Sequence, residues 1–146
     1  GFPDPEAEAL AEETGRLIAE AGAVLVCGGL GGAMEAASRG AKNAGGLVVG
    51  ILPGFSARDA NPYVDIPIVT GMAHARNMIN VLTSDAVIAI KGAAGTLSEI
   101  ALALKCNRPV IGMKSFDLEK AGLDDELFHT ADTPRHAVEL AVSLIK

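Results

Sequence analysis

Two glycine-rich segments of this chain have the residue types and the spacing to bind an anion. One reads Cys-Gly-Gly-Leu-Gly-Gly-Ala-Met over residues 27–34, and the other reads Lys-Gly-Ala-Ala-Gly-Thr-Leu-Ser-Glu over residues 91–99. Each follows an apolar run typical of a buried strand and opens a segment long enough for a helix. Glycine lets the backbone approach a ligand closely, and the unpaired N–H groups at the start of a helix favour phosphate. The two turns therefore predict a phosphate site.

The residues that we expect to contact the ligand come from both turns. The hydroxyl of Thr96 adds a donor to the backbone N–H groups. A tight turn packed against a neighbouring strand is the alternative explanation for either segment alone, but two such turns at one edge of a sheet favour a ligand. The expected contacts are Gly28, Gly29, Gly31 and Met34 in the first turn and Gly92, Ala93, Ala94, Gly95 and Thr96 in the second.

Neither turn has the pattern of a common nucleotide-binding motif. A P-loop needs a Gly-Lys-Ser/Thr triplet to reach a terminal phosphate and hold magnesium, and the chain has none. The first turn does not read G-x-G-x-x-G, and no acidic residue ends the strand that follows, so NAD chemistry is not expected. A pyridoxal-dependent decarboxylase would need a Schiff-base lysine and a partner for the ring nitrogen, which no lysine of this sequence specifies.

The composition predicts a single cytoplasmic domain over residues 1–146. Hydrophobic residues make up 49% and charged residues 21%, which excludes disorder, and no apolar run approaches the roughly 20 residues of a membrane span. The net charge of -6, with scattered Lys and Arg, argues against nucleic acid as a partner. Cys27 and Cys106 lack the spacing of a disulfide framework or a zinc site, so we expect a reducing compartment and no metal.

The order of the apolar patterns predicts an α/β fold. Helical periodicity predicts helices over residues 4–21, 32–44, 72–82, 96–105 and 134–145, and short apolar runs predict strands over 23–27, 47–52, 64–69, 86–90 and 110–113. This alternation is typical of a doubly wound parallel sheet, Rossmann-like, in three α/β/α layers with the ligand at the carboxyl ends of the strands. The polar segment 55–63 predicts a surface loop of a length that often covers a ligand. Because such sheets commonly begin with a strand, we expect a strand upstream of Gly1 that this sequence lacks.

The ordered motifs resemble a known superfamily over roughly residues 5–113. They comprise the first turn with its following Met34, the segment Gly-Ile-Leu-Pro-Gly over 50–54, Met-Ala-His-Ala-Arg-Asn-Met over 72–78, and the second turn in the form G-x-x-G-T-x-x-E. The superfamily contains the cytokinin-activating phosphoribohydrolases called LOG, proteins long labelled lysine decarboxylases, and the molybdenum cofactor carrier proteins. The resemblance is closest to the carrier branch, which typically shows Ala-Arg-Asn and Gly-Thr-Leu-Ser-Glu at these places.

The resemblance also implies which residues act on a ligand. Arg76 and Glu99 match the Arg and Glu that phosphoribohydrolases use on an N-glycosidic bond, where a carboxylate can stabilise an oxocarbenium-like sugar. The plainer explanations are a helix-start carboxylate for Glu99 and a solvated or ion-paired side chain for Arg76. The chain departs from active hydrolases at Asn77, where they have Lys, and at Ala93, where they have Gly. Both changes would leave phosphate binding intact while weakening catalysis, and the resemblance implies that Arg76 and Asn77 also contact the ligand.

We therefore expect a binding or carrier protein for a phosphorylated nucleotide-like or pterin-type ligand, including one of the molybdopterin type. The alternative is a LOG-like phosphoribohydrolase acting on nucleoside 5'-monophosphates. A third and weaker hypothesis is a purely structural assembly subunit. His74, Arg58 and Asp59 are further candidates for ligand contact, although ordinary surface or packing roles are the better explanation of each. Apolar surface on the helices over 72–82 and 96–105 predicts a homodimer or a higher homo-oligomer.

Overall fold

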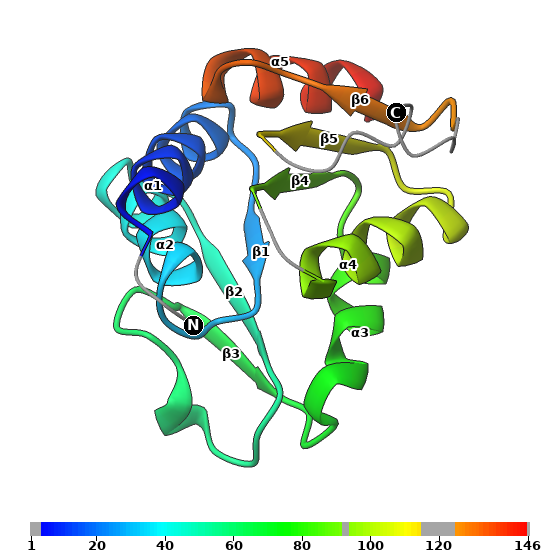
Figure 1. Cartoon of the computed structure of the whole chain (residues 1–146). Coiled ribbons are helices and arrows are strands. Elements are labelled where there is room, and N and C mark those ends of the chain that lie inside the picture. The colour runs from blue at the N-terminus through cyan, green and yellow to red at the C-terminus, as the bar shows by residue number, and fades with distance from the viewer. Residues whose placement is uncertain (1–3, 92–93, 115–124, 146) are drawn as a thin grey trace. The chain divides into compact units, whose positions relative to one another are not determined.

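The computed structural model describes residues 4–91, 94–114 and 125–145. The chain divides into two compact units, Gly1–Asn80 and Val81–Lys146, and each is described by itself (Figure 1). Both units contain three parallel strands and helices packed on them. The expected α/β class with parallel pairing is therefore correct, while a single domain over 1–146 stays a prediction. Among the described residues, no helix has the length and apolar character needed to cross a membrane.

The first unit pairs three parallel strands in the order β1-β2-β3. Cys27 at the end of β1 lies opposite Gly50 of β2, and Leu52 at the end of β2 lies opposite Val69 of β3. The helices α1 and α2 lie side by side in Figure 1 and pack on β1. The elements are α1 (Pro5–Glu20), β1 (Leu25–Cys27), α2 (Ala33–Asn43), β2 (Val48–Leu52), β3 (Ile66–Val69) and the short 3-10 helices η1 (Ala57–Asp59) and η2 (Ala73–Ala75).

The helices α1 and α2 touch backbone to backbone through glycine. A Cβ on Gly15 would lie 2.0 Å from the carbonyl oxygen of Ala37, and a Cβ on Gly40 would lie 2.0 Å from that of Glu12. Both distances are far below any real contact, so no other residue fits at either position without moving a helix. The side chain of Asp4 accepts a hydrogen bond from the Ala7 N–H (3.1 Å) and caps α1.

The second unit pairs its strands in the order β4-β5-β6, also parallel. Its core contains Val81, Ala89, Ile100, Ala103 and Val110. Figure 1 shows α5 and α4 on opposite sides of β4 and β5, and both helices contact these strands. The elements are α3 (Arg76–Thr83), which crosses the boundary between the units, β4 (Val87–Ile90), α4 (Ala94–Lys105), β5 (Val110–Met113), β6 (Phe128–Thr130) and α5 (Pro134–Leu144).

Two expectations about the helices need correction, and one strand was not expected. The segment 72–82 is not one helix: Ala73 has a φ of 52° and its N–H bonds to the carbonyl of Pro53 (3.0 Å), so the regular helix begins only at Arg76. The helix expected from Thr96 starts at Ala94. Strand β6 was not predicted, because its three residues contain no apolar run, yet it pairs with β5 from Phe128 to Thr130.

Candidate functional site

The first glycine turn joins the carboxyl end of β1 to the start of α2. Gly29 has a φ of 76° and Gly32 a φ of 66°, the left-handed region that favours glycine. A Cβ on Gly31 or Gly32 would have no atom within 4 Å, so the outer side of the turn is open. Within the described part of the chain, the backbone N–H groups of Gly31, Gly32 and Ala33 donate no hydrogen bond. Open donors at the positive end of a helix suit an anion.

Arg76 lies against this turn. Its Nη1 donates a hydrogen bond to the carbonyl oxygen of Ile51 (2.9 Å) at the end of β2. A Cβ on Gly28 would lie 2.1 Å from that Nη1 and 2.6 Å from the Sδ of Met34. The structure thus brings together three of the residues expected from the sequence, Gly28, Met34 and Arg76. The absence of a side chain at Gly28 is what leaves space for the guanidinium.

The second turn begins at Lys91, whose φ is 50° and whose N–H bonds to the carbonyl of Met113 (2.9 Å). Gly92 and Ala93 lie outside the described residues. Ala94, Gly95 and Thr96 form the first turn of α4, and Thr96 is half-buried.

Glu99 lies in the second turn of α4, because the helix begins at Ala94. A helix-start carboxylate is therefore a weaker explanation of Glu99 than the sequence suggested, since the dipole acts mainly within the first turn. Arg76 belongs to the first unit and Glu99 to the second. Their joint action on a ligand, and the convergence of the two turns, stay predictions.

Asn61 is a residue of this site that the sequence analysis missed. It lies in the loop before β3, its side chain is buried, and it bonds to the backbone of the first glycine turn at Gly29 and Leu30. The sequence predicts a surface loop over 55–63 because this segment is polar and aperiodic. The signal available was an Asn followed by Pro in that loop, since Asn often bonds to nearby backbone in turns.

The remaining candidates lie in ordinary surroundings. His74 is exposed in η2, and Asn77 is half-buried in the first turn of α3, directly after Arg76. Arg58 is exposed, and its N–H bonds to the Ser56 hydroxyl (3.1 Å) at the start of η1. Asp59 packs its carboxylate on Gly54, where a Cβ would lie 2.7 Å from an oxygen of that carboxylate.

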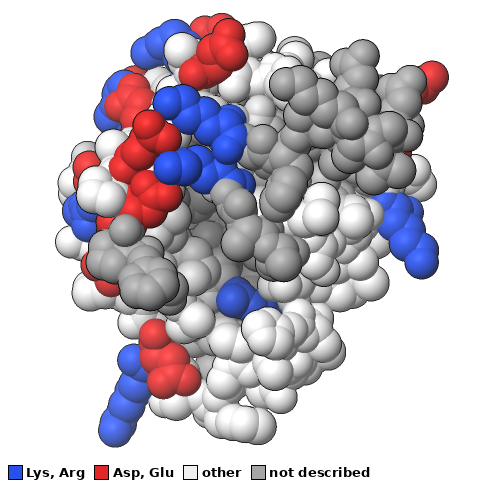
Figure 2. Space-filling view, viewed as in Figure 1, with Lys and Arg blue, Asp and Glu red and all other residues white. Residues whose placement is uncertain are grey.

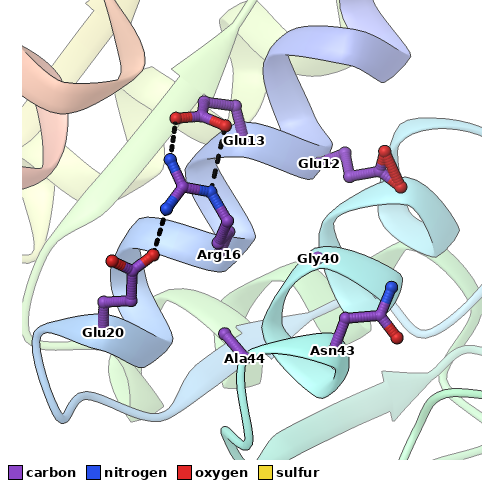
Figure 3. Close-up of a pocket in the computed structure, with 7 residues that line it drawn as sticks. All are labelled: Glu12, Glu13, Arg16, Glu20, Gly40, Asn43 and Ala44. Atoms are coloured by element: carbon purple, nitrogen blue, oxygen red, sulfur yellow. Dashed lines mark hydrogen bonds and ion pairs between the residues drawn. The ribbon is translucent and has the colours of Figure 1, made fainter.

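A separate hollow of about 530 Å³ lies between α1 and α2 and contains none of the expected site residues (Figure 3). Arg16 bridges Glu13 and Glu20 on one side of it. The hydrogen bond that Arg16 donates to the Glu13 carboxylate is the main cause that raises the pKa of Arg16 above its ordinary value. The lining residues are Glu12, Glu13, Arg16, Glu20, Gly40, Asn43 and Ala44.

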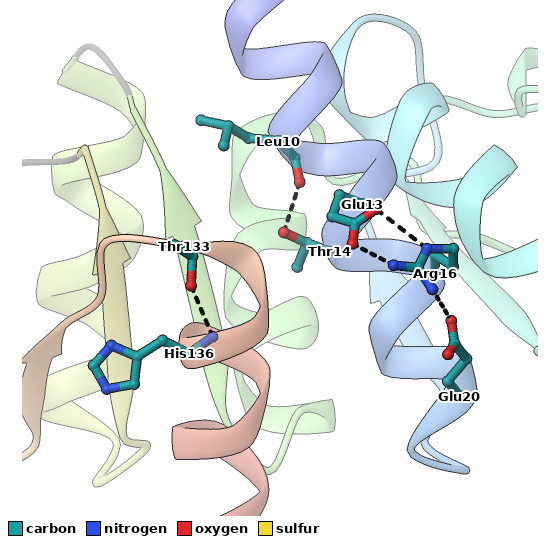
Figure 4. Close-up of polar contacts among 7 residues, drawn as sticks. All are labelled: Leu10, Glu13, Thr14, Arg16, Glu20, Thr133 and His136. Atoms are coloured by element: carbon teal, nitrogen blue, oxygen red, sulfur yellow. Dashed lines mark hydrogen bonds and ion pairs between the residues drawn. The ribbon is translucent and has the colours of Figure 1, made fainter.

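The charges of this region are mostly paired with one another. Figure 2 shows acidic and basic side chains interspersed over the surface of α1 and α2, where Arg39 also pairs with Glu12 (2.5 Å). Figure 4 shows the Arg16 bridge again, together with the cap of α5, in which Thr133 accepts a hydrogen bond from the His136 N–H (3.1 Å). These contacts hold helices in place. No group of three His, Cys, Asp or Glu in the described ranges could hold a metal ion.

Comparison with known proteins identifies the family. The chain belongs to the SLOG cluster4 family, whose model matches residues 2–140. It is 46% identical over 144 residues to an uncharacterized protein from Archaeoglobus fulgidus, covering 98% of this chain and 90% of that protein. The expected resemblance to the LOG superfamily is therefore confirmed.

Solved structures agree with this assignment. The molybdenum cofactor binding protein of the phototrophic bacterium Rippkaea orientalis is 46% identical and superposes with a TM-score of 0.91, covering 99% of this chain and 91% of that one. The molybdenum cofactor carrier protein of Chlamydomonas reinhardtii is 37% identical with a TM-score of 0.87, covering 97% of this chain and 89% of that one. The Rossmann-like fold class and the similarity to the carrier branch are thus confirmed.

Proposed function

We propose that this chain binds and carries a phosphorylated ligand of the molybdenum cofactor type, with the first glycine turn holding the phosphate. The observation that supports this is the open backbone at Gly31 and Gly32, with the Arg76 guanidinium beside Gly28, in a chain 46% identical to a molybdenum cofactor binding protein. A phosphate needs several N–H donors and a nearby positive charge, and this turn offers both.

The residues present fit such a ligand. Gly31 and Gly32 leave a cradle that side chains would fill, and the carbonyl of Ile51 fixes the Arg76 guanidinium at its rim. The thioether of Met34 offers a flexible apolar contact beside that charge. From the second turn, we propose that the backbone of residues 92–95 and the Thr96 hydroxyl add further donors, and that the Asn77 amide replaces a charge with a neutral donor.

Binding is tested by calorimetry with the molybdenum cofactor released from a purified molybdoenzyme and with AMP. We expect the cofactor to bind more tightly than AMP, because its ring system adds contact area to the shared phosphate. Failure of the wild-type chain to bind any phosphorylated ligand would end the proposal.

The hydrolase alternative is not favoured by the comparisons, which match molybdenum cofactor carrier and binding proteins over nearly the whole chain. We expect no free base when the chain is incubated with AMP, and unchanged ligand affinity in Glu99→Gln. Release of adenine by the wild-type chain, lost in Glu99→Gln, would restore the alternative.

We further propose that the chain works in the cytoplasm as a homodimer or higher oligomer. The apolar side chains of Met78 and Leu82 on α3 and Leu97 on α4 are exposed, as is expected for residues that pack between subunits. Cys27 and Cys106 form no disulfide with each other, and a reducing compartment would keep them as thiols.

A further inference from the structure

Asn61 is a buried polar residue that forms hydrogen bonds with the first glycine turn, with Ser38 of α2 and with its own loop. The residue is only 7% exposed. The Asn61 N–H donates to the carbonyl of Gly29 (2.8 Å), and its Nδ2 donates to the carbonyl of Leu30 (3.0 Å) and to the Ser38 hydroxyl (3.3 Å). Its Oδ1 accepts from the Tyr63 N–H (3.0 Å). Every polar group of this side chain is therefore used.

Two of these bonds fix the direction of two peptide groups. In a trans peptide the C=O and the next N–H point in opposite directions. Because the carbonyls of Gly29 and Leu30 point at Asn61, the N–H groups of Leu30 and Gly31 point away from it. Gly31 is exposed, and a Cβ on it would have no atom within 4 Å, so a ligand can approach this part of the turn.

Gly29 packs closely on Gly50, but the outer part of the turn has fewer restraints among the described residues. Gly32 is in the left-handed region, which glycine adopts readily, and a Cβ on Gly31 would meet no atom within 4 Å. If the peptide between Leu30 and Gly31 rotated, its carbonyl oxygen would face an anion where the N–H had been, and would repel it. The hydrogen bond from the Asn61 amide to the Leu30 carbonyl opposes this rotation.

We propose that Asn61 is a positioning residue for an anionic ligand: it turns the N–H donors of Leu30 and Gly31 outward and holds them there. This inference rests on the proposed function of the same turn. It assigns to the loop before β3 a role in ligand affinity, through the backbone and without contact to the ligand. Such preorganised donors need no rearrangement when the ligand binds.

The test compares two substitutions at Asn61. Asn61→Asp keeps the size of the side chain and the backbone bond to Gly29, but it places a carboxylate oxygen against the Leu30 carbonyl. Asn61→Ala removes the side-chain donor without adding charge. We expect both to weaken binding of the molybdenum cofactor and of AMP by about tenfold or more. The reason is that the Gly31 N–H would no longer be held toward the anion, and the loss of a hydrogen bond to a charged group usually has an effect of this size.

Ser38→Ala is the matched control. It removes another partner of the Asn61 amide and the buried bond from the Ser38 hydroxyl to the Met34 carbonyl (2.7 Å), but it leaves Leu30 anchored. We expect a lower Tm with unchanged affinity. A second readout is the amide NMR signal of Leu30 and Gly31, which phosphate should shift in the wild type and in Ser38→Ala but not in Asn61→Ala.

Each outcome separates this inference from the function on which it rests. A wild-type chain that binds neither the cofactor nor AMP removes both. A wild-type chain that binds while both Asn61 variants bind equally well removes the role of Asn61 alone. Weaker binding only in Asn61→Asp identifies a charge effect, and an equal loss in Ser38→Ala identifies a general structural one, and each overturns the inference. Should Asn61→Asp fail to fold, Asn61→Ala decides.

Discussion

At the scale of single residues, the site depends on one side chain and one missing side chain. The Arg76 guanidinium occupies the space in which a Gly28 Cβ would lie and bonds to the Ile51 carbonyl. A positive charge fixed by a backbone carbonyl loses little conformational freedom when it meets an anion. Anion binding at the turn therefore depends on Arg76, which is distant in sequence, as much as on the glycines of the turn.

Gly28→Ala should displace the Arg76 guanidinium and weaken ligand binding by about tenfold, the cost of a lost charge-assisted hydrogen bond. The fold should persist, because the atoms that a new Cβ would meet are the far ends of the flexible side chains of Arg76 and Met34. Calorimetry measures the affinity, and a thermal scan measures Tm.

Arg76→Ala and the double variant Gly28→Ala/Arg76→Ala are the controls for this mechanism. If Gly28→Ala acts through Arg76, the double variant should bind as Arg76→Ala does. Additive losses would show that the new methyl group obstructs the ligand directly.

The sequence could predict the glycines but not their partners. Gly28, Gly29 and Gly31 stand in a motif of adjacent residues, so the type of site was readable. The contacts of Arg76 with Gly28 and of Asn61 with Leu30 join separate segments through the pairing of β1, β2 and β3, and no local pattern encodes such distances. Convergence of the two turns is of the same kind and remains a prediction.

At the scale of elements, the helices α1 and α2 approach each other closely at Gly15 and Gly40. A Cβ at either glycine would lie 2.0 Å from a backbone atom of the other helix. Gly40→Ala should destabilise the protein by about 2 kcal/mol or more, because a Cβ 2.0 Å from the Glu12 carbonyl forces the helices apart and outweighs the gain in helix propensity. Urea unfolding measures this change.

Gly31→Ala is a matched glycine replacement for stability, since its Cβ would meet no atom within 4 Å. Its free energy of unfolding should stay within about 0.5 kcal/mol of the wild type. Equal losses in Gly31→Ala and Gly40→Ala would contradict the close approach of α1 and α2.

Asp65 links α2 to the sheet. Its carboxylate pairs with Lys42 and accepts a hydrogen bond from the Val48 N–H (2.9 Å). The hydrogen bond from Lys42, followed by that from Val48, lowers the pKa of Asp65 below its ordinary 3.8. A lowered folded-state pKa contributes stability above the unfolded value, and this contribution is lost as the pH falls through the folded value.

Asp65→Asn should therefore reduce the acid sensitivity of the protein. The free energy of unfolding of the wild type should fall more steeply than that of Asp65→Asn as the pH decreases below the ordinary value of 3.8. Urea titrations at a series of acidic pH values measure both slopes, and identical slopes would contradict the assignment.

Most elements were predictable because each carries its own pattern. The strands β2 and β5 are continuous apolar runs, and Thr133 and Pro134 mark the start of α5 as a cap and first residue. Strand β6 could not be predicted, because its Phe-His-Thr sequence has no apolar run and the strand forms by pairing with β5. The late start of α3 could not be predicted either, because the positive φ of Ala73 goes with a hydrogen bond from its N–H to the carbonyl of Pro53, which is distant in sequence.

At the scale of the whole molecule, the exposed apolar residues of α3 and α4 bear on assembly. We expect light scattering to show a dimer or a higher oligomer, and Leu82→Asp to shift it toward the monomer, because a charge at a buried interface is unfavourable. Val142→Asp is the control, since Val142 on α5 is 47% exposed and Leu82 48%. A wild-type monomer would contradict the proposal.

The first residue of the short helix α3 lies against the glycine turn. Arg76 donates a hydrogen bond to the Ile51 carbonyl, and its guanidinium lies where a Gly28 Cβ would be. A ligand that drew the guanidinium away from Ile51 would break this hydrogen bond, so the amide hydrogens at the start of α3 would exchange at different rates in the loaded and the empty protein.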